Sequence, residues 1–196
     1  MGNPLALVLA DVFMTKIESK LNRFTANKSK VWVRYVDDIF YIFEIDHVHI
    51  LYVLNRINNW HANIKFTLEM EKNGELPFLD VLIIRSKNKY ETTVYRKPTN
   101  TDLYMQFDSN QSRQYKLGLI KTLTIRILRI CSTNEHQKKE IERLKEVLAD
   151  NGYPSHIIRK GVREGELITK RLSKPTQKWH LFEQSISQWF TMVLNR

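Results

Sequence analysis

The spacing of apolar residues predicts a chain whose structure changes character about halfway along. Apolar side chains recur every three or four positions over residues 5–24, which predicts an amphipathic helix. Two β-branched and aromatic runs, residues 31–36 and 39–43, predict the strands of a hairpin. A second amphipathic helix is expected over residues 46–62, with Asp46 as its N-cap.

Further along, the pattern predicts more strands and then helices. "IKFTLEME" alternates and predicts a strand, and "LPFLDVLIIR" with "YETTVYRKP" predicts a second hairpin around "SKNK". From about residue 100 the spacing becomes helical and predicts two helices between residues 113 and 150, with Ser132, Thr133 and Asn134 as caps at the turn between them. A shorter helix is expected near 155–164, and the last thirty residues are weakly helical. The fold class is therefore α+β.

The charge of the chain makes a polyanion a plausible partner. Its 196 residues fit one domain or a domain with an appendage, and the formal net charge is +10. Residues 1–98 hold 14 Lys and Arg against 11 Asp and Glu, whereas residues 99–196 hold 17 against 10. The excess positive charge therefore lies in the second half. The alternative is a basic surface that only keeps the protein soluble.

Composition excludes several classes of protein. The single cysteine, Cys131, rules out an internal disulfide framework and a CxxC zinc site, and its apolar helical setting predicts an inert buried thiol. No apolar run approaches the ~20 residues of a membrane helix, and the amino terminus lacks the basic segment of a secretory signal. We expect a reducing, intracellular setting and no membrane association.

Two adjacent carboxylates interrupt an otherwise apolar run, "VWVRYVDDIFYIF". Asp37 and Asp38 lie between the two predicted strands, and a turn needs at most one Asp or Asn. Flanked by apolar and aromatic residues, the two carboxylates repel each other, and a divalent cation would relieve that repulsion. The alternative is an acidic turn with no ligand.

Several blocks in a fixed order resemble one family. "MGNPLALVLADVFM" precedes "YVDD", and "ELPFLDVLIIR", "TTVYRKPTNTDLYMQFDSNQS", "LIKTLTIRILRICS" and "DNGYPSHII" follow. This succession resembles the reverse transcriptases of Penelope-like retroelements over roughly residues 1–160. The resemblance implies a partial right-hand polymerase palm over residues 1–97, a helical thumb over 98–165, and a C-terminal tail of uncertain role over 166–196.

The resemblance also implies roles for individual residues. Asp37 would bind the catalytic metals, Mg²⁺ or Mn²⁺, with Asp38 as its companion in two-metal phosphoryl transfer. The residues implied to position template and nucleotide are Gly2, Asn3, Pro4, Tyr35 and Val36. The partners would be an RNA template, a DNA primer and a deoxynucleoside triphosphate, and the location nuclear. "LPFLD", residues 76–80, would be a primer-gripping hairpin, although the residues alone favour an ordinary β-turn and core strand.

The sequence departs from the family at its start. Met1 is the methionine that normally lies inside the "MGNPL" block, so the fingers and the first palm strand with its own metal-binding aspartate are expected to be missing. Asp11 is expected to be a helix-surface residue and not a third ligand. The resemblance therefore implies a polymerase fragment without activity of its own.

The helical region has two interpretations. Its basic residues suit sequence-neutral contacts with phosphates, as in a thumb; the residues predicted to make them are Tyr95, Arg96, Lys97, Arg113, Lys116, Lys121, Arg126 and Arg129. The five on the first long helix are expected on the face away from the apolar core. A solvated helix pair linked by i,i+4 ion pairs is the alternative. At the level of the whole chain, the alternative to a polymerase fragment is a non-catalytic, helix-turn-helix-like nucleic-acid-binding module with a vestigial palm, or a remnant without function.

Overall fold

The computed structural model confirms a mixed α+β chain. It describes residues 5–24, 29–43, 47–86, 89–172 and 188–195. The chain forms two compact units, residues 1–78 with 185–196 (unit 1) and residues 79–184 (unit 2). This division by contacts does not test where a palm would end and a thumb begin, so the boundary at residue 97 stays a prediction.

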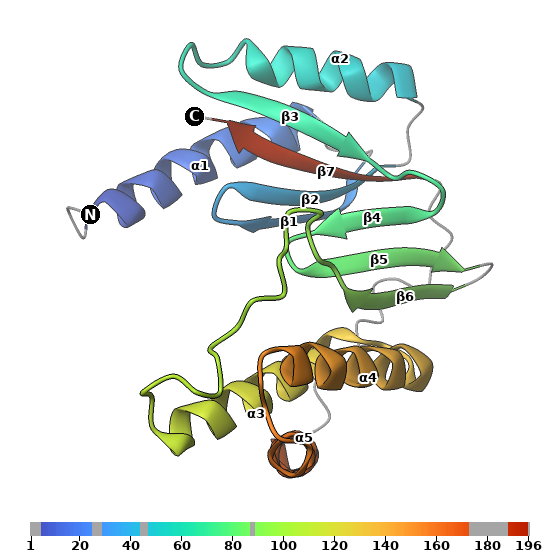
Figure 1. The fold of residues 1–196 in the computed structure, drawn as a ribbon. Coiled ribbons are helices and arrows are strands. Elements are labelled where there is room, and N and C mark those ends of the chain that lie inside the picture. The colour runs from blue at the N-terminus through green and yellow to red at the C-terminus, as the bar shows by residue number, and fades with distance from the viewer. Residues whose placement is uncertain (1–4, 25–28, 44–46, 87–88, 173–187, 196) are drawn as a thin grey trace. The chain divides into compact units, whose positions relative to one another are not determined.

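Unit 1 is built on a four-stranded antiparallel sheet with two helices (Figure 1). Its elements are α1 (Leu5–Phe24), β1 (Ser29–Tyr35), β2 (Asp38–Phe43), α2 (His47–Asn58), β3 (Lys65–Met70), β4 (Glu75–Phe78) and β7 (Gln188–Asn195). The order in the sheet is β1-β2-β7-β3, so the last strand of the chain lies between β2 and β3 and pairs with both. The weak helical signal predicted for the end of the chain is wrong for β7.

Both helices of unit 1 contribute to one hydrophobic core. Met14 and Leu21 of α1 lie with Ile39 of β2 and Phe66 of β3, and α2 adds Ile50, Val53 and Ile57. The side chain of Asn58, at the end of α2, accepts a hydrogen bond from the N–H of Phe66 (2.6 Å) and donates one to its carbonyl (3.0 Å). Asp46, the predicted N-cap of α2, lies outside the described residues.

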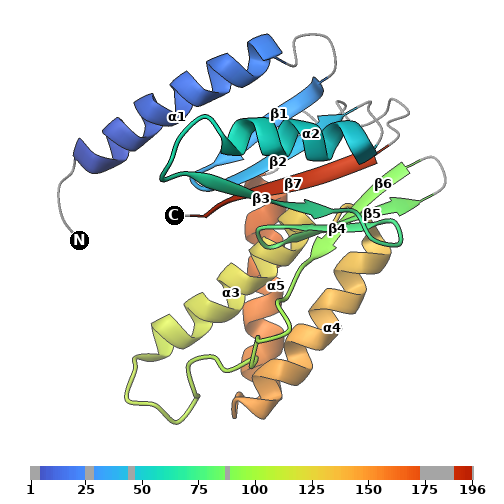
Figure 2. The same cartoon turned by 90° about the horizontal axis from the view of Figure 1, so that it is seen from above.

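The amino-terminal half of α1 is not part of that core. The helical spacing predicts a continuous apolar face from Leu5 to Leu21, yet Leu5, Leu9 and Val12 are all more than 60 % exposed. This half of the helix extends beyond the strands of unit 1 (Figures 1 and 2). The apolar face is therefore present, but only its carboxyl-terminal part is buried by the described residues.

Unit 2 combines a β-hairpin with three helices. Its elements are β5 (Val81–Ser86), β6 (Lys89–Val94), α3 (Arg113–Ile130), α4 (Asn134–Asp150) and α5 (Ser155–Leu172). The run "LPFLDVLIIR" is not one strand as predicted, because Leu79 and Asp80 form a turn in which Leu79 adopts φ 54°. α5 is also longer than the predicted helix over residues 155–164.

The hairpin is attached to the helices at the turn between α3 and α4. Thr92 of β6 donates its N–H to the Ser132 hydroxyl (2.9 Å) and accepts at its carbonyl from the Ser132 N–H (3.1 Å). Thr133 is the N-cap of α4 and accepts a hydrogen bond from the N–H of His136, as predicted. Cys131 is 3 % exposed, and burial raises the pKa of its thiol, in agreement with the predicted inert thiol.

Two glycines allow α5 to pack tightly against α3. A Cβ atom on Gly161 would lie 2.6 Å from Cγ2 of Ile120, and one on Gly165 would lie 2.8 Å from Cβ of Thr124. Ile120 and Thr124 are fully buried, so neither can move aside without disturbing the core. Figure 2 shows α3 and α5 crossing, with α4 alongside.

We predict that Gly161→Ala and Gly165→Ala each lower the free energy of unfolding. Helix propensity favours alanine by roughly 0.5–1 kcal/mol, but overpacking costs about 1–3 kcal/mol, so the net change is a loss. Gly118→Ala is the matched control, because nothing lies within 4 Å of a Cβ at that position of α3. It should raise stability by about 0.5–1 kcal/mol. Urea denaturation followed by circular dichroism measures all three; equal effects at the three positions would contradict the packing.

Candidate functional site

The acidic pair lies at the tip of a hairpin, as predicted. β1 and β2 pair antiparallel, and Tyr35 is opposite Asp38. Val36 and Asp37 therefore form a two-residue turn, and Asp38 is the first residue of β2. Tyr35 and Val36 are exposed, and the two aspartates are half-buried.

The turn stores backbone strain at Val36. Its φ is 54°, in the left-handed region that β-branched residues rarely adopt. Hairpin turns of this length usually place glycine or asparagine at such a position. Strain of this kind costs of order 1–3 kcal/mol and is concentrated at functional sites.

Strand alternation places Asp38 on the side of the sheet away from the helices. Ile39 belongs to the core of unit 1, so its neighbours Asp38 and Phe40 face the opposite side. On that side the ring of Phe40 lies 5.4 Å from the ring of Phe78. Within the described part of the chain, no group of three or more His, Cys, Asp or Glu residues could hold a metal ion. Any ion at this turn would depend on the two adjacent carboxylates and water.

Sequence reasoning missed Arg34 in this region. Its guanidinium binds Glu18 (2.5 Å) and Asp11 (2.6 Å) of α1, and Nη1 donates to the carbonyl of Val36 (3.4 Å). The hydrogen bond with Asp11, together with Glu18, raises the pKa of Arg34 against the opposing effect of burial. Asp11 is thus on the helix surface, as expected, and is engaged by an arginine. The sequence feature that could have identified Arg34 is a basic residue two positions before "VDD".

The residues predicted to position template and nucleotide at the start of the chain, Gly2, Asn3 and Pro4, lie outside the described residues.

The predicted basic face of α3 is only partly present. Arg113 and Arg129 are exposed, as expected. Lys116 is only 8 % exposed, so the prediction that it faces solvent is wrong: its ammonium donates to the carbonyl of Ser109 (2.7 Å) and lies 5.1 Å from the centre of the Phe107 ring. Its long stem lets the charge reach these partners from a buried position.

Three other residues that were predicted to contact nucleic acid form ion pairs within unit 2. Lys121 binds Glu164 of α5 (2.6 Å), and this bond lowers the pKa of that carboxyl group. Arg96 binds the buried Glu140 (2.6 Å), and Arg126 binds Asp80 (2.8 Å). Of the remaining predicted residues, Tyr95 is half-buried and Lys97 is exposed. Whether any of these residues contacts nucleic acid stays a prediction.

A further basic surface of the described residues lies on α5, which sequence reasoning did not select. We call it the α5 basic face; its residues are His156, Arg159, Lys160, Arg163, Lys170 and Arg171. All six are exposed, and they lie on one side of the helix: the first four are spaced three or four residues apart, and Lys170 follows Arg163 after two turns. The exposed Leu167 lies between these two groups. The opposite side carries the buried residues Ile157, Ile158 and Val162 with the two packing glycines. The same spacing is visible in the sequence once the helix is extended past residue 164.

A short turn joins α4 to α5. It consists of residues 151–154, with Gly152 at φ 81°. Asn151 is 3 % exposed and stabilises this turn: its side chain donates to the carbonyls of Asp102 (3.0 Å) and Val147 (2.7 Å) and accepts from the N–H of Tyr104 (2.9 Å). Two helices joined by three or four residues that include glycine are typical of a helix-turn-helix.

Comparison with known families agrees with this geometry. Residues 103–163 are similar to the animal helix-turn-helix domain. The match spans α3, α4 and the first half of α5, which is less than half of the chain. No curated protein and no solved structure matches the chain. Among the described helices, none has the length and apolar character needed to cross a bilayer.

We predict that Val36→Gly raises the free energy of unfolding by about 1 kcal/mol. Glycine relieves the strain of the positive φ, the entropic cost of glycine offsets part of the gain, and Val36 is 56 % exposed, so little burial is lost. Val33→Gly, at an exposed position within β1, is the control and should destabilise the chain. Denaturant titration of both variants is the measurement, and a loss of stability for Val36→Gly would exclude a strained turn.

Proposed function

We propose that unit 2 binds duplex nucleic acid through the α5 basic face, as a helix-turn-helix-type module. The observation that carries this proposal is the arrangement of α4, the turn at residues 151–154 and α5, with cations along the exposed side of the second helix of the pair. In helix-turn-helix proteins the second helix lies in the major groove, and its first residues face the base edges. The similarity over residues 103–163 supports the proposal.

Charge along α5 supports contacts with phosphates. Arg159, Arg163 and Arg171 have no ion-pair partner among the residues that the structure describes. The acidic residues of this helix, Glu164 and Glu166, are half-buried and border the basic face, and Glu164 already binds Lys121. Arginine and lysine on an exposed helix neutralise phosphates irrespective of base sequence. Affinity should therefore be high at low salt and show little sequence preference.

We predict that the chain binds a duplex with affinity that falls steeply as salt rises from about 50 to 200 mM. The log–log slope should be about 0.9 per phosphate contacted, so Arg159→Ala combined with Arg163→Ala should flatten it by about 1.8. Fluorescence anisotropy with a labelled duplex measures the slope. Arg113→Ala with Arg129→Ala tests the exposed cations of α3 in the same way.

The control removes the same charge elsewhere. Lys72 and Lys89 are exposed and lie outside the helices, so Lys72→Ala with Lys89→Ala changes the net charge equally. This pair should leave the slope within error of the parent chain. An equal loss of slope in the control and in the α5 variant would assign binding to net charge alone and contradict the α5 basic face.

A second proposal is that residues 1–97 derive from the palm of a reverse transcriptase similar to those of Penelope-like elements. The position of "YVDD" supports it: the motif lies on a tight hairpin of an antiparallel sheet, with Asp38 on the side away from α1 and α2. In this proposal Asp37 and Asp38 bind Mg²⁺ or Mn²⁺, and Tyr35 and Val36 lie beside the primer end. RNA template, DNA primer and deoxynucleoside triphosphate are the partners, in the nucleus, and residues 98–165 serve as the thumb.

We predict that this chain by itself does not extend a primer with either Mg²⁺ or Mn²⁺. Two-metal phosphoryl transfer needs carboxylates that hold two ions about 3.5–4 Å apart. Two adjacent aspartates hold one ion weakly, and no third candidate ligand stands with them in the described parts of the chain. The measurement is primer extension beside a chain that carries an additional upstream strand with an acidic residue. Extension by the shorter chain that Asp37→Ala abolishes would show that a further ligand exists.

A further inference from the structure

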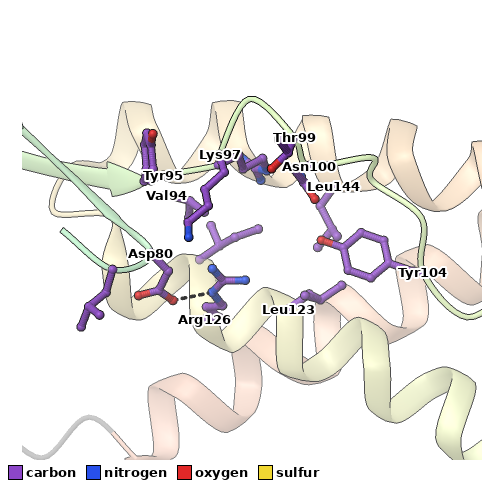
Figure 3. Close-up of a pocket in the computed structure, with 13 residues that line it drawn as sticks. Asp80, Val94, Tyr95, Lys97, Thr99, Asn100, Tyr104, Leu123, Arg126 and Leu144 are labelled. Atoms are coloured by element: carbon purple, nitrogen blue, oxygen red, sulfur yellow. Dashed lines mark hydrogen bonds and ion pairs between the residues drawn. The ribbon is translucent and has the colours of Figure 1, made fainter. Parts of the chain in front are cut away.

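A cavity in unit 2 combines cations with an apolar floor. Its volume is about 380 Å³, within the ~300–1,000 Å³ of small-molecule sites. The floor is formed by Val94, Leu123, Ile127 and Leu144, from β6, α3 and α4. Tyr104 faces the cavity from the opposite end to Asp80 and Arg126 (Figure 3).

One basic residue that lines the cavity is held in ion pairs with residues of the fold. Arg96 binds the buried Glu140 at 2.6 Å, and its Nε lies 4.0 Å from Asp102. Breaking a buried ion pair leaves an uncompensated charge, so Arg96 is held by these carboxylates. We therefore exclude Arg96 as a primary ligand-binding group.

Lys97 and the two terminal nitrogens of Arg126, Nη1 and Nη2, remain available to a ligand. Arg126 uses Nε to bind Asp80, which fixes the guanidinium, and no partner of its Nη1 and Nη2 is found among the described residues. Lys97 is exposed and has no acidic partner within the same residues. Figure 3 shows its side chain directed toward Arg126. A fixed guanidinium fork beside a free ammonium suits the oxygens of a phosphate.

The other residues that line the cavity determine which chemical group can be attached to that phosphate. The turn from Lys97 to Asn100 is closed by a hydrogen bond between the Asn100 N–H and the Lys97 carbonyl (2.9 Å), and it brings Thr99 and Asn100 to the rim. The Asn100 amide nitrogen donates to Asp102 (2.8 Å), so the Thr99 hydroxyl and the Asn100 amide oxygen are the groups that can hydrogen-bond sugar hydroxyls. The apolar floor beside Tyr104 offers contact to a flat ring.

We propose that this cavity binds a nucleoside 5′-phosphate, with the phosphate on Arg126 and Lys97 and the base over the apolar floor. The ligand can be a free nucleotide or the 5′-phosphorylated end of a strand. The site is separate from the α5 basic face and does not depend on duplex binding by that face.

The experiment measures binding of AMP, adenosine and inorganic phosphate to the full chain by isothermal titration calorimetry. AMP should bind saturably, and adenosine and phosphate should each bind at least tenfold more weakly, because each offers only one half of the contacts. Adenosine binding as tightly as AMP would overturn the phosphate assignment, and phosphate binding as tightly as AMP would overturn the base assignment. Absence of saturable AMP binding would overturn the site.

Variants locate the site. Lys97→Met removes an exposed charge without an ion pair, so the fold should persist, and Arg126→Lys keeps the charge but loses the fork; each should weaken AMP about tenfold. Lys138→Met, exposed on α4 outside the cavity, is the matched control and should leave AMP binding unchanged. Equal AMP affinity in all three variants would place binding elsewhere.

Two further measurements are needed. The first distinguishes a free nucleotide from the 5′-phosphorylated end of a strand, and the second distinguishes binding in the cavity from binding to the α5 basic face. A single strand with a 5′-phosphate should bind more tightly than the same strand with a 5′-hydroxyl if the cavity takes strand ends, and Lys97→Met should remove that difference; equal binding of the two strands assigns the cavity to free nucleotide. Arg159→Ala with Arg163→Ala should leave AMP binding intact. Loss of AMP binding in that variant would contradict a separate site.

Discussion

The close approach of α3 and α5 at Gly161 and Gly165 is the constraint on which the helical unit depends. With no side chain at these two positions, Ile120 and Thr124 fit directly against the α5 backbone. That contact fixes which side of α5 is buried, and so fixes which side carries the basic residues to solvent. The arrangement of cations is thus a consequence of packing on the opposite side of the same helix.

The acidic hairpin depends on a different interaction. Arg34 joins β1 to two carboxylates of α1 and also reaches the carbonyl of Val36. Charge-assisted hydrogen bonds of this kind are about twice as strong as neutral ones. They help to hold a β-branched residue at a positive φ, so the position of Asp37 is set by a network that begins on the preceding helix.

Sequence reasoning located the elements whose signals are local. The hairpin at Asp37 and Asp38, α1, and the cap at Thr133 follow from periodicity and capping chemistry alone. The prediction failed where the structure of a segment depends on residues far away in the sequence. β7 pairs with strands more than 100 residues earlier in the chain. The prediction also failed at Lys116, which is buried although Ser109 and Phe107, which its ammonium contacts, precede it closely in the sequence.

For the basic residues of the candidate site, too, local patterns predicted only part of the arrangement. Pattern alone separates cations from the apolar face of α3, but it does not show that Lys121 and Arg126 meet Glu164 and Asp80. The predicted helix over residues 155–164 held four of the six residues of the α5 basic face but ended before Lys170 and Arg171. The fold class followed from local patterns, whereas the candidate surface required knowledge of which charges are already engaged.

The straightness and length of α5 set a limit on how it can meet a duplex. From His156 to Arg171 the helix rises about 22 Å at 1.5 Å per residue. The major groove of B-form DNA is about 12 Å wide, which admits one helix, and the groove curves around the duplex axis. In the proposed complex a rod of this length cannot follow the curved groove floor along its whole extent. Its first turns would lie within the groove, while Lys170 and Arg171 would reach the sugar-phosphate ridge, so one helix would divide between base edges and backbone.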